Sequence, residues 1–157
     1  LLVQPYESRA MYRVLRGRAK IMNQAEGQHL DVLKNRMGIA ADVGIIGYFS
    51  KADICDINGL VNGRKAARMT PQEREAVCVA RNPGFLFVDL DQLTDLKPYI
   101  SIDAWDVCDA YDYPNVRSGH LHYLIVPTAD AARLCKAATG SEPYPATHLL
   151  AAEKPQL

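Results

Sequence analysis

The stretch from residue 39 to residue 63 reads IAADVGIIGYFSKADICDINGLVNG and is the part of the chain from which its architecture can be inferred. Its short apolar runs are bounded by Gly, Asn and Asp, a pattern typical of buried strands joined by tight turns. These runs predict strands at about Gly38–Ala41, Ile45–Phe49 and Ile54–Ile57. Asp42 and Asp56 then lie at strand ends, where α/β sheets commonly present groups to ligands.

The flanking sequence predicts helices and further strands on both sides of this stretch. A helix is expected from about Glu7 to Ala25, and a second helix begins at Thr70 with the pattern of a capping box. Because that helix precedes the apolar run FLFV at Phe85–Val88, it fits a crossover between parallel strands. Further elements are predicted as a helix at Leu90–Tyr99, a strand at His122–Val126 and a helix at Asp130–Ala138.

The predicted architecture is one α/β domain covering residues 1–157. It has a mixed, partly parallel sheet of about four or five strands flanked by helices. Residues 1–26 form its N-terminal helix and residues 141–157 a loose tail.

Bulk properties exclude several classes of protein. The formal net charge is zero, which argues against nucleic acid as a partner. No apolar run reaches the length of about 20 residues needed to cross a bilayer, so a soluble domain is expected. The four cysteines, Cys55, Cys78, Cys108 and Cys135, form no C-x-x-C pair. They leave open two disulfides of unknown pairing, and the preferred interpretation of Cys55 is a buried thiol.

The central stretch also resembles a known family. The order of an apolar strand, Asp, Gly, an aromatic-Ser pair and then Ile-x-Asp-x-x-Gly-Leu is similar to the soluble C-terminal region of polytopic membrane glycosyltransferases of the GT-C class. The matching residues are Asp42, Gly44, Ile46, Tyr48, Phe49, Ser50, Asp56, Gly59 and Leu60, with a second similarity at Asn82–Val88. The resemblance covers about Gly38 to Asp89.

This resemblance implies a parent enzyme that transfers sugars from polyprenyl-phosphate donors, with its catalytic loops outside this chain. The chain itself would be a non-catalytic extracytoplasmic domain on the periplasmic face of a bacterial membrane. Its expected partners are its own transmembrane domain and a glycan or lipid-linked sugar. The basic residues Arg9, Arg13, Arg16 and Lys20 of the first helix could also meet anionic lipid, although a solvated helix face is the simpler interpretation.

Two groups of residues are candidates for ligand binding. In the first, Asp42, Tyr48, Asp56 and Asn58 could line a cleft facing the membrane domain or an acceptor sugar. The simpler alternative is that the two carboxylates cap turns. The second group lies in SIDAWDVCDAYDY, where Asp103, Asp106, Asp109 and Asp112 alternate with Trp105, Tyr111 and Tyr113.

On a helix or a run of turns, the acidic residues of this second group would gather on one side. They could then bind calcium or, together with the aromatic rings, a sugar; a solvated acidic face is the commoner outcome. His120 and His122 could face one metal ion, and Ser118 could pair with His120, but neither pattern has its remaining partners in the sequence.

No catalytic residue, metal site or cofactor is therefore assigned. The alternatives to a glycosyltransferase domain are a stand-alone small α/β enzyme or ligand-binding or carbohydrate-binding protein that uses the acidic and aromatic stretch, and a structural interaction module.

Overall fold

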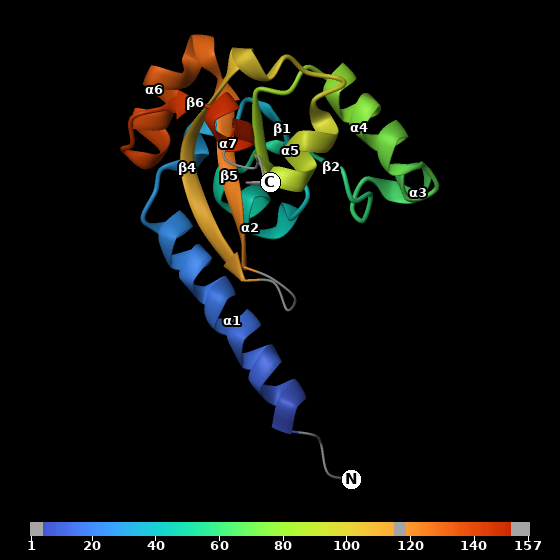
Figure 1. Ribbon diagram of the computed structural model, residues 1–157, viewed down its shortest axis with the longest axis vertical. Coiled ribbons are helices and arrows are strands. Elements are labelled where there is room, and N and C mark those ends of the chain that lie inside the picture. Colours follow the sequence, from blue (N-terminus) through green and yellow to red (C-terminus); the bar gives the residue numbers. More distant parts are fainter. Residues whose placement is uncertain (1–4, 115–118, 152–157) are drawn as a thin grey trace.

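A computed structural model describes residues 5–114 and 119–151, with side chains for residues 15–112 and 121–151. The strands are β1 (Met37–Ala40), β2 (Asp53–Asp56), β3 (Phe85–Val88), β4 (Trp105–Pro114), β5 (Gly119–Pro127) and β6 (Tyr144–Pro145). They form one six-stranded sheet in the order β2-β1-β3-β5-β4-β6 (Figure 1). The β1 strand pairs in parallel with β2 and β3, and the other pairs are antiparallel. The predicted mixed sheet is confirmed, with slightly more strands than expected.

Helices cover both faces of this sheet (Figure 1). One layer contains α1 (Pro5–Glu26), the 3-10 helix η1 (Leu30–Leu33), α2 (Val43–Ser50) and α6 (Thr128–Thr139). The opposite layer contains α4 (Pro71–Ala80), α5 (Leu90–Leu96), the 3-10 helix η2 (Ile102–Ala104) and α7 (Thr147–Ala151). The short helix α3 (Gly63–Ala67) precedes α4.

The β3 strand is buried on both sides, which explains why its sequence is apolar throughout. Phe85 and Phe87 belong to the core of the α1 layer, whereas Leu86 and Val88 belong to the core of the α4 layer. A strand covered on both faces has no solvent side and so no polar alternation. The ring of Phe85 lies over Gly38, its partner in β1, where a Cβ would stand 2.2 Å from the ring. Only glycine fits at that position.

Each helical layer is tied to the sheet by a disulfide. Cys55 of β2 bonds to Cys78 of α4, and Cys108 of β4 bonds to Cys135 of α6. The interpretation of Cys55 as a buried thiol is therefore wrong in its chemistry, although the residue is buried. Its apolar setting suits a disulfide as well as a free thiol, so the sequence pattern did not distinguish them.

Two predicted elements are also corrected. Residues Ile45–Phe49 lie in helix α2 and not in a strand. The parallel pair β1 and β2 needs a crossover between them, and a helix starting at its N-cap Asp42 supplies it. The tail after Ser141 is not wholly loose, because β6 pairs with β4 and α7 packs on α5.

The acidic stretch SIDAWDVCDAYDY mostly forms strand β4, and not the helix or run of turns on which its carboxylates would have gathered. A β-bulge between Val107 and Asp109 shifts the register against β5. The extra residue breaks the two-residue alternation of side chains, so buried and acidic positions no longer follow the pattern expected of a strand.

Candidate functional site

The carboxyl ends of β1, β2 and β3 meet at one edge of the sheet, which we call the carboxyl edge. The chain leaves β1 toward α2 in one layer and leaves β2 toward α4 in the other. Such a change of layer marks the position at which open α/β sheets commonly bind ligands. Asp42, Asp56 and Asp89 stand at or just after the three strand ends, as N-caps or turn residues.

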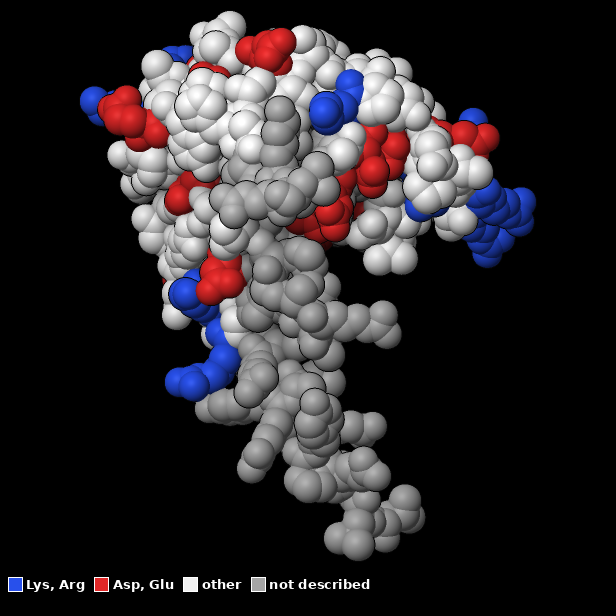
Figure 2. Space-filling view, viewed as in Figure 1, with Lys and Arg blue, Asp and Glu red and all other residues white. Residues whose placement is uncertain are grey.

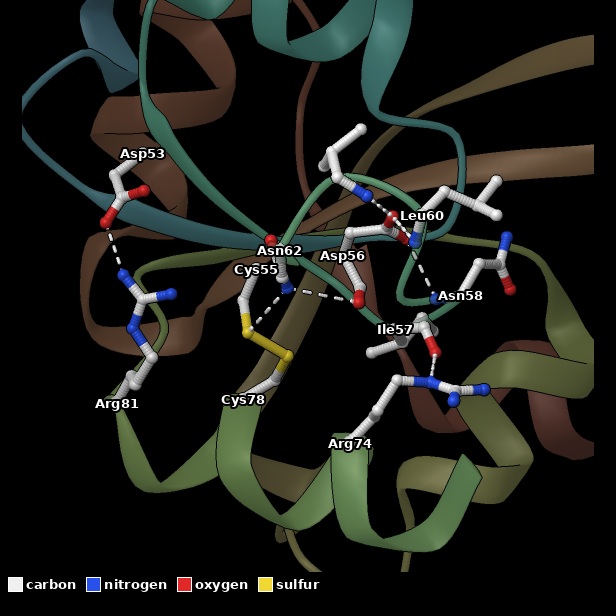
Figure 3. The surroundings of a disulfide bond; sticks show 11 residues. Asp53, Cys55, Asp56, Ile57, Asn58, Leu60, Asn62, Arg74, Cys78 and Arg81 are labelled. Carbon is white, nitrogen blue, oxygen red and sulfur yellow. Dashed lines mark hydrogen bonds and ion pairs between the residues drawn. A yellow bond between two sulfur atoms is a disulfide. The ribbon is translucent and has the colours of Figure 1, made fainter. Parts of the chain in front are cut away.

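Asp56 organises the turn that follows β2. Its side chain is 1% exposed and accepts backbone N–H bonds from Asn58 at 2.8 Å, Leu60 at 2.7 Å and Val61 at 3.0 Å. Figure 3 shows this carboxylate within the turn. A carboxylate that accepts several backbone N–H groups fixes a loop through strong, charge-assisted bonds. Asp56 therefore caps a turn, the simpler of the two roles expected for it.

Asn58 and Asp42 complete the same edge. The Asn58 side chain donates from Nδ2 to the carbonyl oxygen of Ala41 at 2.7 Å, which joins the turn after β2 to the end of β1. Asp42 caps α2 by accepting the N–H of Gly44 at 3.3 Å. The predicted residues Asp42, Asp56 and Asn58 are thus brought together, and each bonds to backbone groups.

Tyr48 is placed differently. It lies near the C-terminal end of α2, is 75% exposed, and its ring packs edge-on against that of Phe49 at 5.1 Å. Its exposure puts Tyr48 on the outer surface of α2, and α2 runs away from the carboxyl edge at which it starts. The structure gives Tyr48 no place in a common cleft with the other three residues.

The turn also presents apolar side chains that the sequence did not single out. Leu60 is 82% exposed and Val61 is 59% exposed. Gly59 adopts a φ of +74°, and a Cβ there would lie 2.8 Å from the Arg74 side chain. The bonds to Asp56 hold Leu60 and Val61 in this turn, so both are fixed at the surface. Leu60 belongs to the quoted family motif, but nothing in that pattern indicated its exposure.

A groove of about 370 Å³ runs beside β2, the edge strand of the sheet. Its lining combines the disulfide of Cys55 and Cys78 with Lys65 and two arginines. Arg74 donates to the carbonyl oxygens of Ile57 at 2.7 Å and Met69 at 2.5 Å. Arg81, the second arginine of the groove, forms an ion pair with Asp53 (Figure 3). Both arginines therefore already hold parts of the domain together.

The aromatic residues of the acidic stretch are not available for stacking on a sugar. Trp105 is 8% exposed and Tyr111 is 1% exposed, each in one of the two cores. The Tyr111 hydroxyl donates to Oε1 of Gln28 at 2.5 Å, and burial raises the pKa of this phenol. The side chain of Tyr113 lies outside those described. The expected sugar-binding surface is thus not formed by Trp105 and Tyr111.

The acidic residues of this stretch point to different neighbours. Asp106 accepts a bond from Thr128, Asp109 from Gln24 and Gln28, and Asp112 pairs with Lys20, while Asp103 is exposed in η2. Each of the three paired carboxylates has a different partner, and the four do not form the cluster that a calcium site would require. Among the residues whose placement is described, no group of three His, Cys, Asp or Glu residues is arranged to hold a metal ion.

The histidine and serine candidates gain no support. His122 is buried, with its ring 5.5 Å from that of Phe87. Ser118 and the side chain of His120 lie outside the described residues.

The N-terminal helix α1 runs antiparallel to β4. Lys20 pairs with Asp112, whereas Gln24, one turn later in α1, bonds to Asp109. Since β4 is parallel to β3, the N-terminal half of α1 projects beyond the carboxyl edge (Figure 1).

Of the basic residues expected to meet lipid, Arg16 and Lys20 are on exposed parts of α1. The side chains of Arg9 and Arg13 lie outside those described. No helix in residues 5–114 and 119–151 is long and apolar enough to cross a membrane.

Comparison with known proteins gave no match to any family model, and no significant match among curated proteins or solved structures.

Proposed function

We propose that this chain is a non-catalytic extracytoplasmic domain of a GT-C class membrane glycosyltransferase, and that its carboxyl edge packs on the membrane-embedded catalytic part. One observation carries the proposal. The N-terminal half of α1 and the turns after β1 and β2 lie on the same side of the domain (Figure 1).

The length of α1 determines how far its N-terminal end lies beyond the carboxyl edge. From Lys20 back to Pro5 the helix extends about 22 Å at the α-helical rise per residue. A polypeptide segment that precedes α1 would therefore lie on the side that the carboxyl edge faces. A membrane domain on that side, and the bilayer around it, would meet the exposed Leu60 and Val61, which otherwise remain in water.

The disulfides support an extracytoplasmic location. Disulfides persist in oxidising compartments such as the bacterial periplasm and are rare in reducing ones. Both bonds in this domain join a strand to a helix and so belong to its core. The two disulfides therefore support the proposed periplasmic location.

The contacts of the edge residues favour a supporting role over chemistry. The hydrogen bonds described above join Asp42, Asp56 and Asn58 to backbone groups of the turns at this edge. With these contacts the three residues can shape the surface that meets the membrane part or an acceptor glycan. The fragment is then expected to have no transferase activity by itself.

Site-specific photo-crosslinking in the full-length membrane protein tests this function. A photoreactive amino acid at Leu60 is expected to link to the transmembrane part, detected as an internal cross-link by mass spectrometry. The same group at Val32 is the matched control, because Val32 is also an exposed apolar residue but lies in η1, before β1. Equal internal cross-linking from both positions would refute the proposed packing.

A stand-alone ligand-binding protein is the second candidate, and the groove beside β2 favours it. The groove has a volume of about 370 Å³, which is within the range of small-molecule sites. Ala66 lines the groove, so Ala66→Trp would fill it. Binding of sugars or sugar phosphates detected by NMR, and lost in this variant, would support the second candidate; no binding by the unaltered chain would exclude these ligands.

A further inference from the structure

We propose that the segment from Leu60 to Arg68 binds a membrane surface containing anionic phospholipids. Its contact residues are Leu60, Val61, Arg64, Lys65 and Arg68, which we call the α3 patch. The inference rests on the proposed function for the presence of a bilayer beside the domain, but the lipid contact is tested without the rest of the enzyme.

The apolar part of the α3 patch is held out of the core by the turn that carries it. Leu60 and Val61 each donate their backbone N–H to the buried carboxylate of Asp56. Asn62 adds a bond from Nδ2 to the Asp56 carbonyl oxygen at 3.2 Å. A turn fixed at so many points cannot fold its apolar side chains inward without losing these bonds. The two side chains are therefore presented to whatever lies outside the domain.

The basic part follows immediately in the chain. Arg64, Lys65 and Arg68 are all exposed, and none of the ion pairs found among the described side chains involves them. Figure 2 shows a group of blue side chains over α3, at the right-hand end of the molecule. Because the formal net charge of the whole chain is zero, this group is a local concentration of positive charge.

Two exposed apolar residues followed closely in the chain by three exposed cations match the chemistry of a bilayer surface. At that surface apolar side chains enter the boundary of the acyl region, while Lys and Arg remain among the head groups. Anionic lipid attracts basic segments in proportion to their number of charges. The α3 patch supplies both features within one short segment, so an anionic lipid surface is the occupant that its chemistry fits.

Sedimentation of the 157-residue chain with vesicles tests the lipid contact. We expect binding to vesicles of mixed phosphatidylglycerol and phosphatidylcholine, and much weaker binding to phosphatidylcholine alone. Each basic residue near such a surface contributes about fivefold in affinity, so R64Q/K65Q/R68Q should bind about 100-fold more weakly. The matched control K34Q/K97Q/K136Q changes the net charge equally at exposed lysines outside the patch. It should keep most of the affinity.

The apolar part of the α3 patch is tested separately with Leu60→Ser, and Val32→Ser serves as its control at another exposed apolar position. Only the change at Leu60 should weaken binding to the mixed vesicles. Near-ultraviolet circular dichroism of every variant verifies that the fold is retained. Three outcomes would overturn the inference: no binding by the unaltered chain, undiminished binding of the R64Q/K65Q/R68Q variant, or an equal loss in the lysine control.

The lipid test and the cross-linking test fail independently. Loss of vesicle binding together with a specific internal cross-link from Leu60 would discard the lipid contact and keep the packing on the membrane part. Vesicle binding through the α3 patch without that cross-link would keep the lipid contact and discard the packing on the membrane part.

Discussion

Replacing Asp56 by alanine should destabilise the domain by about 3 kcal/mol. The substitution removes the acceptor of three backbone N–H bonds, of 2.8, 2.7 and 3.0 Å. Bonds to a charged group contribute about 1.5 to 3 kcal/mol each when their donors stay dry. The donors belong to Asn58, Leu60 and Val61, which are exposed residues, so water can replace part of each bond. About 1 kcal/mol per bond is therefore the working value.

The assay is equilibrium unfolding in urea, followed by the fluorescence of Trp105. This residue is the single tryptophan of the chain and is buried in the core between the sheet and the α4 layer, so its emission reports global unfolding. Asp56→Asn is the matched comparison. It keeps one oxygen as an acceptor but turns an NH₂ group toward the remaining N–H groups, and should cost about 1 to 2 kcal/mol.

The predicted order of stability is therefore unaltered protein, then Asp56→Asn, then Asp56→Ala. A change below about 0.5 kcal/mol for Asp56→Ala is the range of an ordinary surface substitution. Such a result would refute the assignment of Asp56 as the residue that fixes the turn, and with it the argument that Leu60 and Val61 are rigidly presented.

Three further predictions use the same unfolding assay. Gly38→Ala should cost about 3 kcal/mol or more, because the new methyl group would overlap the Phe85 ring; a near-neutral result would contradict that packing. Burial, with Asp95 adding to it, raises the pKa of Glu75 above its ordinary 4.5, so the ionised side chain opposes folding. The free energy of unfolding should then fall as pH rises through that raised pKa, and Glu75→Gln should be the more stable protein at neutral pH but not at pH 3; an equal difference at both pH values would contradict the assignment. Replacing both cysteines of the disulfide between β4 and α6 with serine should cost about 3.5 kcal/mol for its sequence separation of 27, and a loss below 1 kcal/mol would show that the loop-entropy argument does not apply.

Local signals predicted several elements well. The capping box that begins at Thr70 is present, with Glu73 as its other member. The apolar run at Phe85–Val88 forms a strand with the bounds expected from the sequence. Both signals depend on residues that are neighbours in the chain, which is why a sequence pattern was sufficient.

Other features depend on residues that are far apart in sequence. The run at Ile45–Phe49 is as apolar as a strand, and only the parallel pairing of β1 with β2 requires it to be a crossover helix. The disulfide partners could not be deduced, because their pairing depends on which helix covers which strand. The bulge in β4 likewise arises from its pairing with β5.

The candidate site was predicted in part. Asp42 and Asp56 were predicted at strand ends, and they meet with Asn58 at the carboxyl edge because β1 and β2 are parallel. Tyr48 was misplaced along with its strand. The exposure of Leu60 could not be predicted, since an apolar residue after a turn is usually assigned to the core and only the bonds to Asp56 hold it outside.

The most direct test of the proposed glycosyltransferase domain is the sequence of the open reading frame upstream of Leu1. The account predicts several spans of about 20 apolar residues there, each long enough to cross a bilayer, with acidic residues in a loop outside the membrane. An open reading frame without such spans would contradict it. The groove beside β2 would then become the place to search for a ligand.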